Sequence, residues 1–318
     1  MDEKYKIIMP NFNDWESLRM LIRQIDEEIR DESLKGAISI LVINDGSTEG
    51  FTGGKLNEVF DVEIVNLVRN LGHQKAICIG LAYVNASGFK GNVIVMDADG
   101  EDKPSDIPAL IAQSVHAPGR IVFAYRRKRS ESLSFKFFYF FYKMVFYLLT
   151  GKPIKFGNFC IIPHNVLNNV AHISEIWNHF SGGIIRSRIP YTTVPLDRGK
   201  RLAGQSRMNF VALLIHGLSA ISVHIDTVAV RLLIASVFFI AFSLLGILVI
   251  IIIKLTGAYV MPGWPSAVFT SLLNIFLQAF IISLFLVFLV LNHRTQLQFI
   301  PAKDYKDFIE EKSIANKS

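Results

Sequence analysis

Two carboxylates one residue apart, Asp97 and Asp99, follow the most apolar strand predicted in the first half of the chain, residues 93–96. Ligands of open α/β folds bind at the carboxyl ends of the strands. Paired carboxylates at that edge suit a hard divalent cation such as Mg²⁺, which completes its coordination with substrate phosphates. The spacing therefore predicts a cation that bridges to a diphosphate, and it indicates a nucleotide-sugar substrate.

A second acid follows another predicted strand. Residues 38–43 are largely apolar and lead into Asn44, Asp45 and Gly46. Two parallel strands that end in acids bring several carboxylates into one crevice, where their repulsion requires a cation or hydrogen-bond donors. Asp45 also has a purely structural alternative, because its side chain can form an Asx-turn before Gly46.

The elements that must position these acids alternate short apolar runs with polar, helix-compatible stretches, which is the βαβ rhythm of a parallel sheet. We predict strands at residues 6–10, 38–43, 62–67, 93–96 and 120–124, and helices at residues 15–30, 74–86 and 104–114. The sequence contains no internal repeat and no low-complexity segment. The first part of the chain is therefore expected to be an α/β domain.

The composition indicates a membrane-anchored protein. Of the 318 residues 51% are hydrophobic, and the mean hydropathy is +0.37. The excess lies in two uncharged runs, residues 232–253 and 265–291, each long enough to span a bilayer core. The connector between them holds a single charged residue, so we predict a transmembrane hairpin. Asn274 and Gln278, one helical turn apart in the second run, are expected to hydrogen-bond either a neighbouring helix or the first span.

The flanking charges predict the orientation of the hairpin. The basic residues ahead of the first span are Arg198, Lys200, Arg201, Arg207 and Arg231, and those after the second are Arg294, Lys303, Lys306 and Lys312. This distribution puts the N-terminal domain and the tail in the cytoplasm. The net charge of +6 fits an anionic membrane surface, and no motif indicates nucleic-acid binding. No signal peptide is expected, and the two cysteines fit a reduced compartment.

Two further segments are expected at the membrane surface. Residues 132–149 are dense in aromatics and contain Lys136 and Lys143, so an interfacial helix is a better interpretation than a span, with a core helix as the alternative. Residues 208–230 form an amphipathic segment ahead of the first span. The predicted organisation is an α/β domain over residues 1–207, a juxtamembrane helix over 208–230, a hairpin over 231–292 and a cytoplasmic tail over 293–318.

A series of short motifs follows in order along the chain. They are Met-Pro-Asn-Phe-Asn at 9–13, Asn-Asp-Gly-Ser-Thr at 44–48, Arg-Asn-Leu-Gly-His-Gln-Lys-Ala at 69–76 with Gly80, Met-Asp-Ala-Asp-Gly-Glu at 96–101, Arg126-Arg127, Gly-Asn-Phe at 157–159, and the Arg-rich segment 198–207. On these motifs the chain resembles the family 2 glycosyltransferases of the GT-A fold, over roughly residues 5–230. It is most similar to their membrane-anchored polyprenyl-phosphate members, such as dolichol-phosphate mannose synthase and bactoprenol glucosyltransferase.

The resemblance implies a role for each matching position. Asp97, Asp99 and Glu101 would hold the family's Mg²⁺ or Mn²⁺ at the diphosphate, and Asp45 would hold the nucleoside. The residues expected to act in catalysis are Asp99, Glu101, Arg126 and Arg201, and those expected to bind the donor are Pro10, Asn11, Asn13, Asp45, Gly72, Lys75, Asp97, Arg198, Gln205 and Ser206. Arginine suits phosphate recognition, although the cluster at 126–129 has a solvated or lipid-facing alternative. His73 is interpreted as a helix-start residue that packs locally.

The chain departs from the family pattern at three places. Asn44 stands where many relatives have an acid, Asn158 stands where polyprenyl-phosphate enzymes usually carry an acid before Phe159, and Arg207 replaces the commoner lysine. These departures concern the nucleoside contact and the acceptor more than the reaction.

The resulting hypothesis is an inverting, metal-dependent enzyme that moves a sugar from a nucleotide donor to polyprenyl phosphate in the membrane. The frequency of donors in the family favours a UDP-sugar. A lipid phosphate is already ionised and needs no general base, whereas a glycolipid or polysaccharide hydroxyl, the alternative acceptor, needs one, for which Asp106 and Asp197 are the candidates. A non-enzymatic scaffold is disfavoured because the three carboxylates are present. The resemblance also implies a tetramer.

Overall fold

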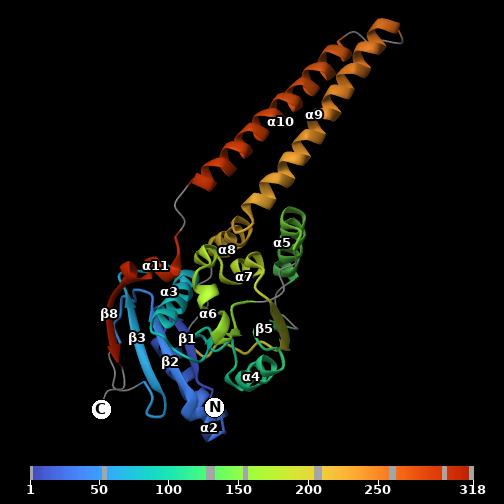
Figure 1. The fold of residues 1–318 in the computed structure, drawn as a ribbon. Coiled ribbons are helices and arrows are strands. Elements are labelled where there is room, and N and C mark those ends of the chain that lie inside the picture. The colour runs from blue at the N-terminus through green and yellow to red at the C-terminus, as the bar shows by residue number, and fades with distance from the viewer. Residues whose placement is uncertain are drawn as a thin grey trace. The chain divides into compact units, whose positions relative to one another are not determined.

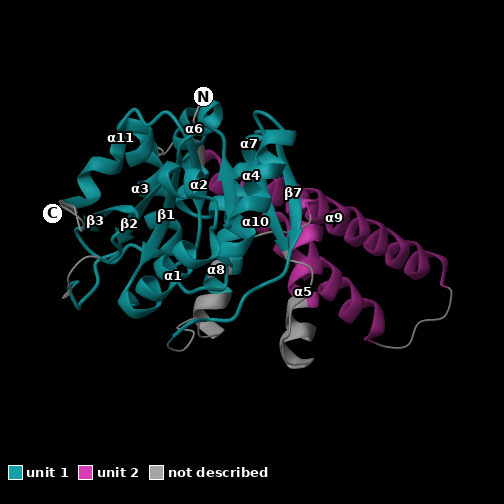
Figure 2. Ribbon diagram, turned by 90° about the horizontal axis from the view of Figure 1, so that it is seen from below, with its two compact units in different colours: residues 1–139, 154–223, 298–318 teal, residues 140–153, 224–297 magenta. Residues whose placement is uncertain are grey.

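The computed structural model describes residues 3–51, 56–126, 133–152, 157–203, 210–257, 263–295 and 299–314. The chain divides into two compact units, which Figure 2 distinguishes by colour. The first unit comprises residues 1–139, 154–223 and 298–318, and the second comprises residues 140–153 and 224–297.

A mixed eight-stranded sheet is the centre of the first unit. Its strands are β1 (Tyr5–Asn11), β2 (Ile38–Asn44), β3 (Asp61–Leu67), β4 (Asn92–Val95), β5 (Ile121–Arg126), β6 (Cys160–Ile162), β7 (Tyr191–Leu196) and β8 (Ile309–Ile314), in the spatial order β7-β5-β6-β4-β1-β2-β3-β8. The strands β4, β1, β2 and β3 pair in parallel, so their carboxyl ends share one edge. β6 and β8 pair antiparallel to their neighbours. The predicted α/β fold class is confirmed.

Two hydrophobic cores lie on opposite faces of this sheet, and the first unit also contains helices. These helices are α1 (Trp15–Glu28), α2 (Glu32–Ala37), α3 (His73–Ala86), α4 (Ile107–His116), α6 (His164–Ala171), α7 (Phe180–Ser187), α8 (Phe210–Ser222) and α11 (Pro301–Asp304), with 3₁₀ turns η1 (Pro104–Asp106), η2 (Ser174–Trp177) and η3 (Tyr305–Phe308). Successive strand residues face opposite sides, so Ile7 and Met9 belong to the core that includes α1. Ile8 belongs to the core on the α3 side, where a Cβ on Gly80 would lie 2.8 Å from its Cγ2 atom. Only glycine permits that close contact between helix and sheet.

The C-terminal segment returns to the first unit, which the sequence did not lead us to expect. β8 pairs with β3, and α11 packs on α3 (Figure 1). The ring of Trp177 lies 3.9 Å from that of Phe299 and 5.1 Å from that of Phe308, measured between centroids. Residues 299–314 are therefore part of the first unit's core and sheet rather than a free tail.

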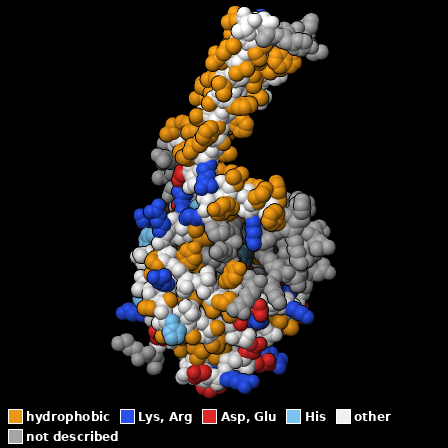
Figure 3. All heavy atoms as spheres, turned by 90° about the vertical axis from the view of Figure 1, so that its right-hand side faces the viewer, with side chains coloured by type: hydrophobic (Ala, Val, Ile, Leu, Met, Phe, Trp, Pro, Cys, Tyr) orange, Lys and Arg blue, Asp and Glu red, His pale blue; other side chains and the backbone are white. Residues whose placement is uncertain are grey.

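The second unit contains two long apolar helices, α9 (Ile225–Thr256) and α10 (Trp264–Thr295). Both are long and apolar enough to cross a membrane. The most apolar stretches of the two helices have mean hydropathies of 3.1 and 2.6, and only 17% and 6% of their residues are buried. Figure 3 shows hydrophobic side chains over the visible face of this hairpin. The two helices contact each other through small residues, including Ser236 and Ser283, whose Oγ atoms lie 2.6 Å apart. The predicted apolar hairpin is confirmed.

The helix α5 (Leu133–Thr150) corresponds to the predicted interfacial segment. Within the second unit, its side chains Phe140, Phe141 and Leu148 are exposed. Arg231, near the start of α9, donates hydrogen bonds from Nη1 to the carbonyl oxygens of Leu148 at 2.6 Å and Tyr147 at 3.3 Å. The end of α5 is thereby fixed to the beginning of the first apolar helix. Its position at a membrane surface stays a prediction.

Candidate active site

Asp97 and Asp99 lie in a tight loop after β4. Backbone hydrogen bonding extends one residue past the strand, since Met96 donates from its amide to the carbonyl of Ile8 at 3.1 Å. The amide of Asp97 then donates to Oδ2 of buried Asp102 at 3.1 Å, and the amide of Glu101 donates to Oδ1 of Asp99 at 2.9 Å. The carboxylates of Asp99 and Asp102 thus hold the backbone of the loop in place. The motifs did not indicate this structural role of Asp102.

A segment from a distant part of the chain, residues 198–203, lies across this loop. The amide of Gly199 donates to the carbonyl of Glu101 at 2.9 Å, and the amide of Leu202 donates to the carbonyl of Asp99 at 3.0 Å. Gly100 has φ +83°, and a Cβ there would lie 2.3 Å from Cγ of Leu202. Glycine is required at this position by both its backbone conformation and the close contact.

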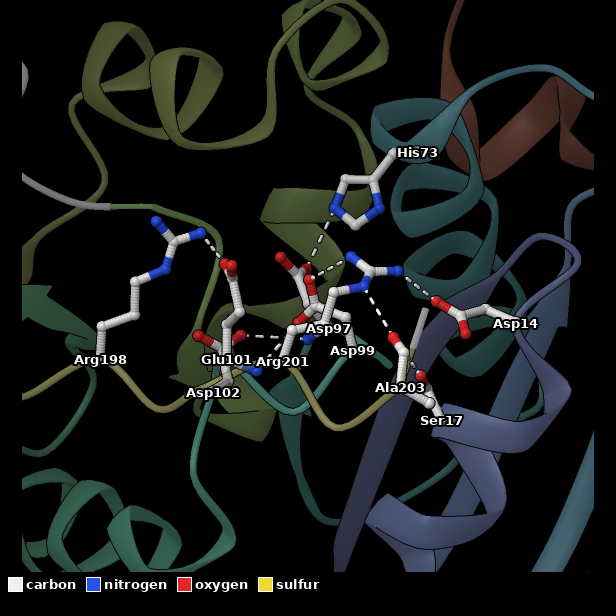
Figure 4. A network of polar contacts seen from close by, with 10 residues as sticks. All are labelled: Asp14, Ser17, His73, Asp97, Asp99, Glu101, Asp102, Arg198, Arg201 and Ala203. Atoms are coloured by element: carbon white, nitrogen blue, oxygen red, sulfur yellow. Dashed lines mark hydrogen bonds and ion pairs between the residues drawn. The ribbon is translucent and has the colours of Figure 1, made fainter. Parts of the chain in front are cut away.

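The arginines of this segment neutralise the predicted metal carboxylates (Figure 4). Arg201 donates from Nη1 to Oδ2 of Asp99 at 3.2 Å, and its Nη2 pairs with Asp14. Arg198 forms an ion pair with Glu101. Burial lowers the pKa of Arg198, while the nearby carboxylates of Asp99 and Asp97 act in the opposite direction. Both arginines lie beside the acids, and their roles as site residues stay predictions; Asp14, which the motifs did not single out, contacts Arg201.

His73 is the first residue of α3, as expected of a helix-start residue, but the expectation that it packs only locally is wrong. Its Nε2 lies 3.1 Å from Oδ1 of Asp97 and 3.1 Å from Nδ2 of Asn158. Burial by itself would lower the pKa of the imidazole, but the carboxylate of Asp97, with smaller contributions from Asp99 and Asp102, raises the pKa above its usual value. His73 therefore links the first turn of α3 to the acid pair and to Asn158.

Asp45 holds a neighbouring loop together. Its Oδ1 accepts a hydrogen bond from the amide of Leu71 at 2.7 Å, and its Oδ2 accepts one from the amide of Gly72 at 2.9 Å. The side chain is buried, with 3% exposure. Burial raises its pKa, whereas these two amides and the charges of His73 and Lys75 oppose that change. Both carboxylate oxygens thus have structural partners at the start of α3, whose N-cap Gly72 has φ +100°.

Asparagines line the carboxyl ends of three adjacent strands. Asn11, Asn44 and Asn66 are register partners on β1, β2 and β3, and Asn44 donates from Nδ2 to Oδ1 of Asn66 at 2.8 Å. Asn11, which follows Pro10, has 2% exposure, and its amide atoms have no hydrogen-bond partner among the described residues. Asn13, with φ 51°, accepts a hydrogen bond from the amide of Thr48. A buried amide without a partner is costly, so Asn11 is suited to contact a ligand or an ordered water.

The remaining expected site residues are placed in different ways. The ammonium group of Lys75 lies 5.1 Å from the centroid of the Trp177 ring. Arg126 ends β5, and its side chain lies outside the described residues. Gln205 and Ser206 also lie outside them.

The acids fit a divalent cation that shares its coordination with a substrate. No group of three His, Cys, Asp or Glu side chains within the described residues is arranged to hold a metal. Mg²⁺, however, is usually bound through one or two carboxylates together with substrate phosphates and water. Asp97 and Asp99 supply oxygen donors of the right chemistry, with Glu101 two residues further along. Among the described residues, the basic side chains that contact these acids include His73, Arg198 and Arg201.

Comparison with known proteins identifies the family. The model of glycosyl transferase family 2 matches residues 6–177, more than half of the chain. The chain belongs to glycosyl transferase family 2. It is therefore a glycosyltransferase, and its mostly parallel sheet forms a GT-A-like domain that is followed by two long apolar helices packed as a hairpin.

Relatives in this family include enzymes that act on a lipid phosphate. The chain is 27% identical, over 67% of its length, to undecaprenyl-phosphate 4-deoxy-4-formamido-L-arabinose transferase of Salmonella choleraesuis, of which it covers 64%. An uncharacterised glycosyltransferase of Bacillus subtilis is 25% identical, and the similarity covers 85% of this chain and 83% of that protein. An uncharacterised glycosyltransferase of Synechocystis is 28% identical, with 66% of each chain covered. The chain thus spans just under two thirds of the length of two of these three relatives.

Solved structures show more distant similarity. Glucosyl-3-phosphoglycerate synthase from Mycobacterium tuberculosis, in complex with Mn²⁺, UDP-glucose and phosphoglyceric acid, is 13% identical with a TM-score of 0.48, covering 71% of this chain and 80% of that one. A mannosyltransferase from Pyrobaculum calidifontis, in complex with GDP-mannose and Mn²⁺, is 14% identical with a TM-score of 0.44, covering 88% and 87%. Similarity this distant assigns no ligand to the present chain.

Proposed function

We propose that this glycosyltransferase moves a sugar from a nucleotide donor to a polyprenyl phosphate at the cytoplasmic face of a membrane, with inversion at the anomeric carbon. The observation that carries the proposal is the meeting of Asp97, Asp99 and Glu101 with Arg198 and Arg201 at the carboxyl edge of a sheet whose chain continues into an apolar hairpin. The acids account for the donor, and the hairpin accounts for a membrane-bound acceptor.

On the donor side, the leaving diphosphate must be stabilised as the sugar develops oxocarbenium character. Mg²⁺ or Mn²⁺ held by Asp97 and Asp99 would supply Lewis-acid stabilisation of that charge. Arg198 and Arg201 carry planar guanidinium groups that match phosphate oxygens as well as carboxylates. When a donor occupies the site, we expect the two arginines to exchange their carboxylate partners for its diphosphate. We propose uracil as the base of the donor nucleotide, because UDP-sugars are frequent donors in the family.

On the acceptor side, the connectivity of the chain supports a lipid. α8 precedes the hairpin and β8 follows it, and both belong to the same compact unit, so both ends of the hairpin lie on the side of the membrane that holds the catalytic unit. The basic flanks favour the cytoplasm. A lipid phosphate is ionised at neutral pH and attacks without a general base. An amide at Asn158 in place of an acid is compatible with such an acceptor. The undecaprenyl-phosphate relatives support the same class of acceptor.

A product-partition assay tests the proposal. The full-length protein in detergent, with undecaprenyl phosphate and Mn²⁺ or Mg²⁺, is incubated with radiolabelled UDP- and GDP-sugars, and butanol-extractable label is counted. We expect label in the organic phase with one donor and its loss on addition of EDTA. Donor hydrolysis without organic label would overturn the phosphate acceptor and favour a hydroxyl. Undiminished transfer in EDTA would overturn the role of the cation.

A further inference from the structure

The acid at the start of α1 does not perform the local role that its position favours. Asp14 is the N-cap residue of α1, and an aspartate there normally accepts a hydrogen bond from a free amide in the first turn of its helix. Asp31 does so for α2, since its carboxylate accepts from the amides of Ser33 and Leu34. The carboxylate of Asp14 makes no such bond and pairs instead with Nη2 of Arg201. Capping of α1 is therefore given up for a contact with a residue 187 positions away.

The backbone that carries Asp14 is held in place on both sides. Asn13, the preceding residue, has φ 51°, a left-handed conformation that asparagine adopts more readily than most residues. The amide of Asn13 donates to Oγ of Ser47 at 2.9 Å, which ties this turn to the loop after β2. In the first turn of α1, the hydroxyl of Ser17 donates to the carbonyl of Ala203 at 3.3 Å. The direction of the Asp14 carboxylate is therefore set before any ligand binds.

The guanidinium group of Arg201 is held at three of its five N–H donors (Figure 4). Nε donates to the carbonyl of Ala203 at 3.0 Å, Nη2 pairs with Asp14, and Nη1 donates to Oδ2 of Asp99 at 3.2 Å. The first two partners lie outside the acids expected to hold the cation, whereas Asp99 is one of those acids. A cation bound to Asp99 would therefore compete only for the contact at Nη1.

We propose that Asp14 is a positioning residue for recognition of the donor diphosphate, because it holds Arg201 in place while Asp99 turns to the cation. The inference rests on the proposed function and specifies which of the two carboxylate partners of Arg201 is exchanged. Nη1 leaves Asp99 for a phosphate oxygen, whereas Nε and Nη2 keep their partners and fix the plane of the guanidinium. An arginine ordered beforehand loses less side-chain freedom on binding, so the pair with Asp14 raises the affinity for the diphosphate. Asp14 itself does not contact the donor.

The first test measures equilibrium binding of UDP and GDP, and of the matching nucleosides uridine and guanosine, to the full-length protein in detergent with Mn²⁺. Asp14→Asn keeps the shape of the side chain and removes its charge. For the diphosphate that binds the wild type, we expect this variant to weaken binding about three- to tenfold and to leave nucleoside binding unchanged. Asp14→Glu, which restores the charge, should recover part of the loss. The matched control, Asp31→Asn, alters an acid that does cap its helix and should leave both affinities unchanged.

A double-mutant cycle with Arg201→Met tests whether Asp14 acts through this arginine. In the Arg201→Met background, Asp14→Asn is expected to change the affinity for the diphosphate by less than about twofold. An equal loss in both backgrounds, an equal loss for nucleoside and diphosphate, or tighter binding of the diphosphate by Asp14→Asn would overturn the inference. If neither UDP nor GDP binds the wild type, the proposed donor is wrong, and the role of Asp14 fails with it. If one of them binds and Asp14→Asn leaves its affinity unchanged, only the role of Asp14 fails.

Discussion

Replacing Asp45 by Asn tests whether this acid anchors the loop before α3 or reads the nucleoside. The carboxylate accepts from two backbone amides, those of Leu71 and Gly72. A carboxamide has one oxygen, so in the variant one buried amide N–H faces an NH₂ group. Leaving a buried donor unsatisfied costs about 1–3 kcal/mol, and losing a hydrogen bond to a charged acceptor costs about as much. We therefore expect Asp45→Asn to lower the free energy of unfolding by about 2–4 kcal/mol.

The expected change is large enough to measure by thermal unfolding. For a domain of this size, about 1 kcal/mol shifts Tm by roughly 2–4 °C, so the variant should melt roughly 5–15 °C below the wild type. Intrinsic tryptophan fluorescence of the full-length protein follows the first unit through Trp15 and Trp177 once Trp264 is replaced by Phe in the background.

The control is Asp61→Asn, which removes an exposed acid at the start of β3 and should change stability by less than about 0.5 kcal/mol. If Asp45→Asn melts within the range of that control but loses discrimination between nucleotides, the acid contacts the base and the anchoring argument is refuted. If it melts early and binds all nucleotides more weakly, the loop anchor explains both effects.

Three further changes test the site and the tail. Asp99→Asn should reduce turnover at least about 100-fold while the protein stays folded in the membrane, because the site loses an anionic ligand; near-normal turnover would rule out the cation assignment. Gly100→Ala should displace the segment carrying Leu202 and lower donor affinity, measured by nucleotide titration, and an unchanged affinity would show that the segment is not needed for binding. Trp177→Leu removes the ring that contacts Phe299 and should lower stability by about 1–3 kcal/mol in denaturant unfolding; a smaller change than that of an exposed substitution would show that the aromatic contact is dispensable.

The sequence predicted the central strands well because their apolar runs are local. The predicted strands at 6–10, 38–43 and 62–67 differ from β1, β2 and β3 by no more than one residue at either end. Each run is buried on both faces, and that pattern needs no tertiary knowledge to recognise. β6 has only three residues, and β7 contains Pro195 with alternating exposure. Such short or edge strands carry too little apolar pattern to be read from sequence.

The site could be predicted only in part, because its pairings join distant segments. Motif order indicated that Asp97, Asp99 and Arg201 act together, and the structure brings these side chains to one edge. The motifs could not indicate that the His73 side chain contacts Asp97, because nothing in the sequence near a helix-start histidine identifies its partner. The same holds for Asp14, whose contact with Arg201 bridges 187 positions along the chain. Side chains that meet through loops depend on the folded sheet rather than on local pattern.

The return of the chain after the hairpin had a local sign that was overlooked. Residues 76–84 of α3 are buried without interruption, whereas a helix at a surface normally keeps one polar face. One face of α3 packs on the sheet, so the opposite face requires a cover, and part of that cover comes from α11 and Tyr305, which is 6% exposed. A polypeptide ending at residue 231 would therefore lack both β8 and this cover. The apolar hairpin is thus inserted within the chain of the catalytic unit. The segments that precede and follow it both belong to the unit whose sheet carries the acids.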